Sequence, residues 1–274
     1  MAKINGLAVK AALGLSILFG LSAGGAMAGS ITVSNVTEPY GSISVDIHDS
    51  YQSTVTNCSG SGCVAGGTIG LQTSIGALNS YCVDLFDYIN LGGQNTTFDQ
   101  NALASGETFR NGNATGTWTQ NQVTLLTRLL TNGSALLSGS NTSAQNAVIS
   151  SALQVAIWDV EYDTAAANGT YNLTSTSDGF YFTATDSNAT TGSLAVLNTA
   201  QTFLNDSTGV NGTGITWNTN ANQSVQYLTS DPSGTQNQIY LATTTGSTVP
   251  EPSTVAVFGL GLIGLWAARR RKMI

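Results

Sequence analysis

The stretch SAQNAVISSALQVAIWDVEYD, residues 143–163, has the apolar spacing of an α-helix. Apolar side chains at Val148, Leu153 and Ile157 recur at helical intervals, which places them on one side of such a helix. Ser143 stands where an N-cap is needed, since its hydroxyl can accept a hydrogen bond from the first turn. The stretch therefore predicts a helix in the middle of the chain, capped by Ser143.

Two further stretches have the same helical spacing, residues 119–132 before it and residues 192–206 after it. Thr119 and Ser193 stand at their starts and are the predicted N-caps. The polar run at 205–222 is predicted to be a loop, because turn-forming residues dominate it.

Four other stretches favour β-strands, because their residues alternate between apolar and polar. They are residues 41–50, 81–89, 224–229 and 238–244. Two precede the predicted helices and two follow them, a layout typical of the α+β class. We predict an α+β fold in which antiparallel strands form sandwich-like or barrel-like sheets, with an inserted helical subdomain of about three helices.

The first 28 residues have the composition of a secretory signal peptide. Lys3 and Lys10 precede the apolar run ALGLSILFGLSAGGA, and AMA ends the segment at 26–28. This order predicts export with cleavage after Ala28. A membrane-spanning helix is the alternative, disfavoured because the apolar run is short. Residues 29–246 are then expected to form one extracellular domain.

Residues 247–274 combine three elements: VPEPST at 249–254, an apolar run at 253–268, and RRRK at 269–272. As a helix the apolar run would be about 24 Å long at 1.5 Å per residue. That length barely spans a hydrocarbon core of about 30 Å. The basic cluster predicts that this end stays in the cytoplasm while the body lies outside.

This order of elements resembles the PEP-CTERM sorting signal of bacteria that have an outer membrane. The residues that carry the resemblance are Pro250, Glu251, Pro252, Arg269, Arg270 and Arg271. It implies an exosortase as a partner, transient insertion of the C-terminal helix in the membrane, and removal of the tail. It also implies delivery to the envelope, the cell surface or an exopolysaccharide matrix. An ordinary C-terminal anchor is the alternative.

The body of the chain, residues 29–246, is strongly acidic. It contains Arg110 and Arg128 as its only basic residues, no lysine, and fourteen acidic residues, for a formal charge of −12. Binding to nucleic acid is excluded, because a polyanion needs basic side chains to neutralise its phosphates. No Asp-x-Asp-x-Asp-Gly calcium loop occurs in the sequence, and we predict neither a metal nor a cofactor.

The chain contains three cysteines, and one of them is left without an obvious partner. Cys58 and Cys63 lie five residues apart across a Gly/Ser turn, which favours a small disulfide loop in an exported protein. A metal site is the alternative, disfavoured because a zinc site needs four ligands. Cys82 is then unpaired, and a buried structural thiol is the simplest interpretation.

Gln154 is unusual because it lies in a mainly apolar helical stretch, where its amide needs partners. The elements YCVD at 81–84 and LQVAIW at 153–158 together resemble the thioester domains of bacterial surface adhesins. The resemblance implies an internal thioester between Cys82 and Gln154, with a mixed β and helical architecture. Residues that would support the thioester are Tyr81, Asp84 and Trp158.

The resemblance also implies the chemistry. An amine or hydroxyl of a surface or matrix partner, polysaccharide or protein, would attack the Gln154 carbonyl and stay covalently attached. Such capture happens once per molecule, so the protein is not expected to be an enzyme. Aromatic side chains such as Phe86 would exclude water from the activated acyl group.

Two other functions remain as alternatives. A cysteine hydrolase would need a histidine base, and His48 is the only histidine, flanked by Asp46 and Asp49. A non-covalent matrix or carbohydrate-binding protein would need exposed aromatic residues on a sheet face, with Cys82 as a structural thiol. Its candidate residues are Trp118, Trp217, Tyr227 and Tyr240.

Overall fold

The computed structural model describes residues 29–49, 65–85, 96–111, 114–137, 139–163, 170–177, 180–209, 217–230 and 236–243. Several predicted features lie outside these residues: the signal peptide, the disulfide between Cys58 and Cys63, the aromatic residue Phe86, and the C-terminal tail with Pro250, Glu251, Pro252 and Arg269–Arg271.

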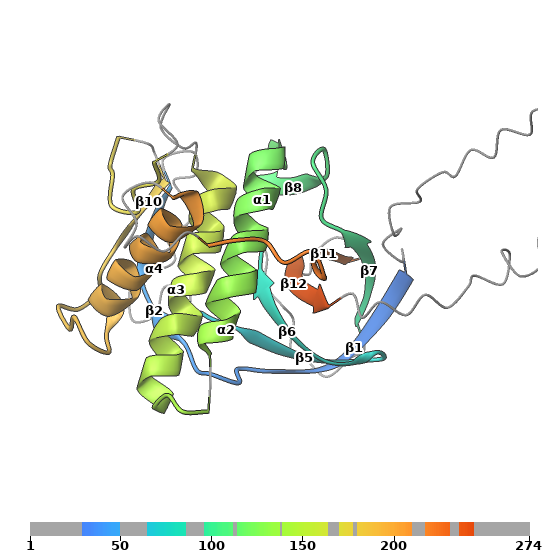
Figure 1. Ribbon diagram of the computed structural model, residues 1–274, viewed down its shortest axis with the longest axis horizontal. Coiled ribbons are helices and arrows are strands. Elements are labelled where there is room, and N and C mark those ends of the chain that lie inside the picture. Colours follow the sequence, from blue (N-terminus) through green and yellow to red (C-terminus); the bar gives the residue numbers. More distant parts are fainter. Residues whose placement is uncertain are drawn as a thin grey trace, which may run out of the picture.

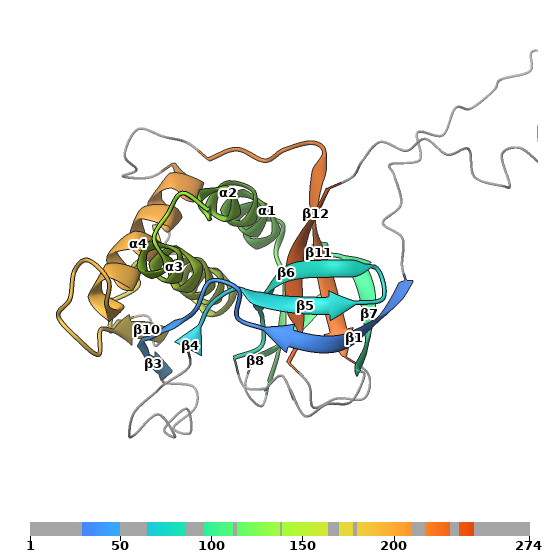
Figure 2. The ribbon, with the colours of Figure 1, turned by 90° about the horizontal axis from the view of Figure 1, so that it is seen from below.

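Six antiparallel strands close into a barrel, in the order β1-β5-β6-β12-β11-β7 (Figure 1, Figure 2). The ring closes because β1 pairs with β5 on one side and with β7 on the other. The strands are β1 (Gly29–Thr37), β5 (Ile69–Thr73), β6 (Gly76–Cys82), β7 (Thr96–Ala102), β11 (Gln223–Ser230) and β12 (Gln238–Thr243). This closed antiparallel sheet confirms the predicted α+β class with barrel-like strands.

Three two-stranded sheets accompany the barrel: β2 (Ile43–Ser44) with β4 (Ala65–Gly66), β3 (Asp46–Asp49) with β10 (Phe180–Thr183), and β8 (Thr108–Asn111) with β9 (Ala114–Thr117). The prediction of one strand over 41–50 is wrong, since β2 and β3 pair with different partners. The predicted strand over 81–89 is also wrong in its bounds. Its first two residues end β6, and the chain turns at Asp84, where φ is +79°.

Three predicted helices are present as α1 (Gln120–Arg128), α3 (Ser143–Tyr162) and α4 (Ser193–Thr208). Beyond α1 the chain continues as a π-helix, η2 (Leu129–Gly133), and a short turn, α2 (Ser134–Leu136), where the sequence predicted one regular helix to 132. Gly133 allows η2 to lie close to α3, because a Cβ at this position would clash with a methyl group of Leu153. The predicted loop at 205–222 is wrong in its start, since α4 reaches Thr208.

Of the three predicted N-caps, only Thr119 is confirmed. Thr142 caps α3 in place of Ser143, because its hydroxyl accepts from the Gln145 amide and the Gln145 side chain accepts from the Thr142 amide. Gly192 occupies the N-cap position of α4 in place of Ser193. The Asp186 carboxylate accepts from the Ser193 amide at 3.1 Å, so a residue outside the helix caps the first turn of α4.

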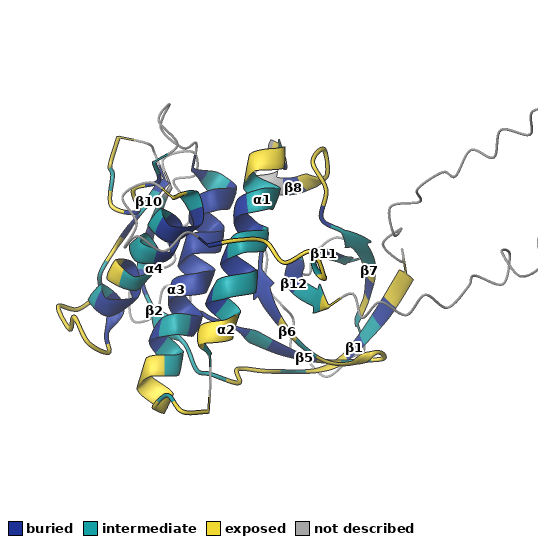
Figure 3. Cartoon of the chain, in the orientation of Figure 1, coloured by how far each residue is buried: buried dark blue, intermediate teal, exposed yellow. Residues whose placement is uncertain are grey.

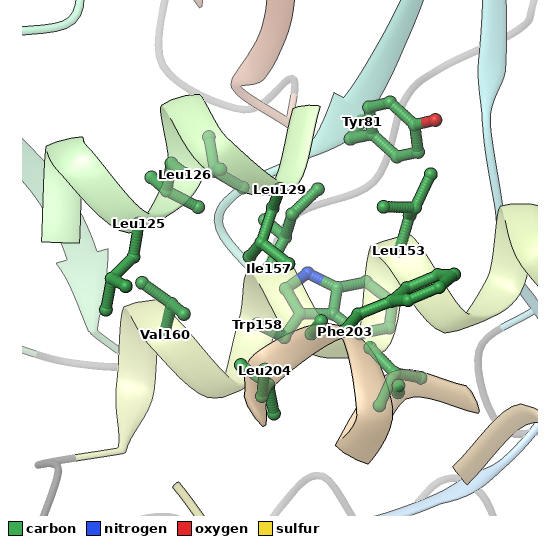
Figure 4. Packing of buried hydrophobic residues seen from close by; sticks show 14 of the residues in the cluster. Tyr81, Leu125, Leu126, Leu129, Leu153, Ile157, Trp158, Val160, Phe203 and Leu204 are labelled. Carbon is green, nitrogen blue, oxygen red and sulfur yellow. The ribbon is translucent and has the colours of Figure 1, made fainter. Parts of the chain in front are cut away.

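Helix α3 is the centre of the main hydrophobic core, and from Ser150 to Glu161 every residue is buried, whereas its first turn is exposed (Figure 3). It is covered by α1 and η2 on one side and by α4 on the other, and Trp158 lies between Leu129 and Phe203 (Figure 4). A helix that is apolar all round must be buried in this way. None of the helices in the described ranges is long and apolar enough to cross a membrane.

A second, smaller core comes from the barrel strands alone. Its buried members are Ile31, Val33, Leu71, Phe98, Leu228 and Tyr240. The barrel therefore has a core of its own, while β6, β11 and β12 also contribute to the core around α3, with Tyr81 and Cys82 coming from β6. This arrangement places the end of β6 against α3.

Candidate functional site

The candidate site lies where the last residue of β6, Cys82, meets the middle of α3 at Gln154. The two residues are 72 positions apart in the chain. Their approach depends on the close contact of the β4 strand with α3. A Cβ at Gly66 would lie 2.8 Å from Cγ of Gln154 and 2.9 Å from Cζ3 of Trp158. Only glycine leaves room there for both side chains.

The side-chain amide of Gln154 pairs with the main chain of Cys82. The Cys82 amide donates to Oε1 at 2.8 Å, and Nε2 donates to the Cys82 carbonyl at 2.7 Å. The Gln154 side chain thereby makes the two hydrogen bonds that a neighbouring strand would otherwise make to the last residue of β6. Its side chain is completely buried, which satisfies the requirement that a buried amide be hydrogen-bonded.

Gln238 of β12 holds the Cys82 thiol from the opposite side. Its Nε2 lies 3.4 Å from Sγ, and its Oε1 accepts from the Ser80 hydroxyl at 3.1 Å. The register of the barrel places Gln238 directly opposite Cys82. The thiol is therefore oriented by a fully buried side chain that the sequence analysis did not single out.

Burial raises the pKa of the Cys82 thiol to about 12, against a smaller lowering by the Gln238 hydrogen bond; the nearby carboxyl groups of Glu161 and Asp84 also raise this pKa. The thiol is consequently protonated at neutral pH. Attack by the sulfur therefore requires that its proton be removed during the reaction.

The raised pKa predicts how alkylation of free Cys82 depends on pH. Because only the thiolate reacts, its rate should rise about tenfold per pH unit and continue to rise beyond pH 9, toward about 12. An exposed thiol would instead reach its plateau near its ordinary pKa. Iodoacetamide labelling of Cys82, followed by mass spectrometry over a pH series in which the protein stays folded, measures this. A plateau near pH 9 would contradict the prediction.

A second pair of contacts lies two residues further along the chain. The Glu161 carboxylate accepts from the Asp84 amide at 3.1 Å and 3.4 Å, and both residues are buried. Burial, together with the neighbouring Asp84 carboxylate, raises the pKa of Glu161 well above its ordinary value. Glu161 follows Gln154 by seven residues, so both lie on the same face of α3.

The predicted supporting residues Tyr81, Asp84 and Trp158 all lie around this pair. The Thr68 hydroxyl donates to the Tyr81 hydroxyl oxygen at 3.0 Å, so Tyr81 is anchored to the connection between β4 and β5. Trp158 is fully buried one turn after Gln154, and its Nε1 has no acceptor among the residues that the structure describes. Its role there is packing.

His48 lies in the β3–β10 sheet rather than at Cys82. Its Nε2 lies 2.9 Å from the Thr183 hydroxyl oxygen, and its ring stacks on Tyr181 with centroids 4.4 Å apart. The only histidine of the sequence thus lies in a different sheet from Cys82 and has its own contacts there. The described residues therefore do not form a Cys–His pair at Cys82.

The four aromatic residues that a carbohydrate-binding face would need are not exposed. Trp118, Trp217, Tyr227 and Tyr240 are all buried, with at most 7% of their surface exposed. The prediction that they could form a binding face is wrong, because each packs in the hydrophobic core. No cluster of metal-ligating side chains occurs within the described ranges either.

Sequence reasoning missed Glu161, Gln238 and Gly66. The helical spacing from Gln154 could have indicated Glu161, since the two are two turns apart on α3. Gln238 has no such local signal, because it is 156 residues away from Cys82 and meets it only through strand pairing.

Residues 248–272 match the family model described as the PEP-CTERM protein-sorting motif. The chain carries a PEP-CTERM sorting motif. The predicted C-terminal sorting signal is thereby confirmed, and the PEP-CTERM motif marks the chain as exported and as a substrate for exosortase processing. A comparison with curated proteins finds no match.

Two solved structures resemble the fold of this chain distantly, and both come from Streptococcus pyogenes. The N-terminal domain of the pilus tip adhesin Cpa is 16% identical, with a TM-score of 0.38, and the similarity covers 74% of this chain and 94% of that domain. The N-terminal thioester domain of the fibronectin-binding protein SfbI is 13% identical, with a TM-score of 0.37 and coverages of 73% and 93%.

Proposed function

We propose that this protein is carried to the cell surface or an exopolysaccharide matrix and there captures a partner covalently through a thioester between Cys82 and Gln154. The observation that supports it most is the pairing of a completely buried Gln154 amide with the main chain of Cys82. A glutamine needed only for packing would gain nothing from burial of its amide beside the buried free thiol of Cys82.

The geometry suits the first step of thioester formation. Sγ of Cys82 attacks Cδ of Gln154, the carbon–nitrogen bond breaks, and Nε2 leaves as ammonia with the proton of the thiol. The Cys82 amide already donates to Oε1, the oxygen on which negative charge develops. A preorganised donor at that oxygen stabilises the transition state. Holding both groups in one core makes the reaction intramolecular, which favours it strongly.

The second step consumes the thioester. An amine of the partner attacks the Gln154 carbonyl carbon, the sulfur–carbon bond breaks, and the amine proton passes to the Cys82 sulfur. A stable amide then joins the partner to Gln154; a hydroxyl would form an ester in the same way. Each molecule reacts once, so the protein binds its partner without turnover.

The burial of Trp118, Trp217, Tyr227 and Tyr240 weighs against sugar binding on an aromatic face. A covalent route to a surface polysaccharide or protein needs no such face. The strongly acidic body should favour partners that are neutral or cationic over polyanions.

Intact mass spectrometry of the exported protein tests the proposal. We expect a mass lower by one ammonia than the sequence requires, and a methylamine adduct on Gln154 after treatment with that amine. The Cys82→Ala variant serves as the control and should have neither feature. A full mass in the unmodified protein, with no methylamine adduct, would refute the thioester.

A further inference from the structure

Helix α3 contacts the segment after β6 at more than the Cys82–Gln154 pair. Three side chains of α3 hydrogen-bond to main-chain groups in residues 82–85. They are Gln154 to both main-chain groups of Cys82, Glu161 to the amide of Asp84, and Tyr162 to the amide of Leu85 at 2.9 Å. Residues 82–85 therefore follow α3 over about two turns.

The same segment is held from the other side by residues at the start of β12. The Val83 amide donates to the Asn237 carbonyl at 3.1 Å, and Gln236 Nε2 donates to the Asp84 carbonyl at 3.0 Å. Main-chain groups of the segment thus face α3 and β12 in turn. Its path is determined from both sides.

That path includes an unfavourable backbone conformation. Asp84 has φ of +79°, a region that costs a non-glycine residue about 1 kcal/mol or more. Such a conformation persists only where surrounding contacts impose it. The Glu161 carboxyl group is the group that holds the amide of this residue. Burying a carboxyl group costs free energy, so its presence here calls for a structural or functional reason.

We infer that Glu161 is a positioning residue for the proposed thioester: by holding the Asp84 amide, it fixes the turn that directs the Cys82 sulfur at the Gln154 carbonyl carbon. The inference rests on the proposed function. It is based on two contacts from one face of α3 to a single turn: Gln154 binds the main chain of Cys82, and Glu161 binds the amide of Asp84. Misplacement of the sulfur by about 1 Å is enough to slow its attack about a hundredfold.

The test compares Glu161→Ala and Glu161→Gln in the full-length exported protein. Glu161→Ala should slow thioester formation about a hundredfold, as followed by the mass lost with ammonia. Glu161→Gln retains an oxygen that can accept from the Asp84 amide, and should restore most of the rate. Ser151→Ala is the matched control, because Ser151 is an α3 side chain that accepts from the main-chain amide of Ile43 at 2.8 Å and so holds a segment other than residues 82–85.

Three results would overturn the inference. A normal thioester in Glu161→Ala would show that the contact is dispensable. Equal loss in Ser151→Ala would show that any damage to α3 suffices. Equal loss in Glu161→Gln and Glu161→Ala, with unchanged Tm, would assign the carboxyl a role in proton transfer instead of positioning.

Amide hydrogen exchange over residues 82–85 separates this inference from the proposed function. Glu161→Ala should speed exchange there, while Ser151→Ala should not, whether or not the thioester has formed. A wild-type protein without the thioester would refute the proposed function and with it the positioning role, yet faster exchange would still identify Glu161 as the group that fixes the turn. Unchanged exchange in Glu161→Ala, in a protein that does form the thioester, would refute the inference alone.

Discussion

Replacing Gln154 with alanine is expected to abolish amine incorporation and to lower the free energy of unfolding by about 4 kcal/mol. The chemical loss follows because no carbonyl remains for Cys82 to attack. The loss of stability follows because the amide and carbonyl of Cys82 lose their hydrogen-bond partners in a buried site. Each unsatisfied buried group costs about 1–3 kcal/mol, and the missing side chain leaves a cavity.

Gln201→Ala is a matched control for this prediction. Gln201 of α4 also bridges main-chain groups, accepting from the Leu173 amide at 3.2 Å and donating to the Tyr171 carbonyl at 2.9 Å. This variant should lose stability but keep methylamine incorporation. Denaturant unfolding and intact mass measure the two effects. Normal incorporation in Gln154→Ala would contradict the assignment of the acyl group to this residue.

Gln154→Glu sharpens the same test. The substitution keeps the size of the side chain but removes the two hydrogens that Nε2 offers, so the carboxylate would face the Cys82 carbonyl without a proton between them. We expect loss of capture and a lower Tm than that of the wild type, despite the similar volume. A variant with wild-type stability would mean that the hydrogen bonds between Gln154 and the Cys82 main chain contribute little.

Replacing Trp158 with alanine is expected to cost about 4 kcal/mol of stability and to shorten the lifetime of the thioester. Trp158 is fully buried and packs against Gly66, where it also closes the space beside Gln154. Removing the indole opens a cavity next to the activated acyl group. Water that enters this cavity would hydrolyse the thioester, regenerating the thiol and leaving a carboxylate at position 154.

Two variants separate packing from chemistry here. Trp158→Phe keeps an aromatic ring and removes an Nε1 that has no acceptor in the described part of the chain, so it should largely preserve thioester lifetime. Trp118→Ala removes an equally buried indole that packs on Phe109, and should lower stability without faster hydrolysis. The appearance of a hydrolysed mass over time is the measurement. Equal hydrolysis in wild type and Trp158→Ala would contradict the prediction.

Local patterns predicted the elements more reliably than their ends. Alternation identified β11 and β12, and helical spacing identified α1, α3 and α4, because these signals depend on neighbours within a few residues. The caps of α3 and α4 were missed because competing groups lay close by: Thr142 forms a capping box with Gln145, and Asp186 serves the start of α4. The strand at 81–89 was overextended because contacts from α3 and β12 impose the turn at Asp84.

The sequence by itself determined the sorting motif, the acidic and lysine-free body, and the two short elements that contain Cys82 and Gln154. Each of these is readable because its residues are contiguous or are simply counted. Only the tertiary structure decided that Gln154 pairs with the Cys82 main chain, that Gln238 and Glu161 complete the surroundings, and that the four aromatic residues are buried. The physical reason is that these contacts join residues 72 to 156 positions apart, which approach one another only when the barrel closes and α3 packs against the end of β6.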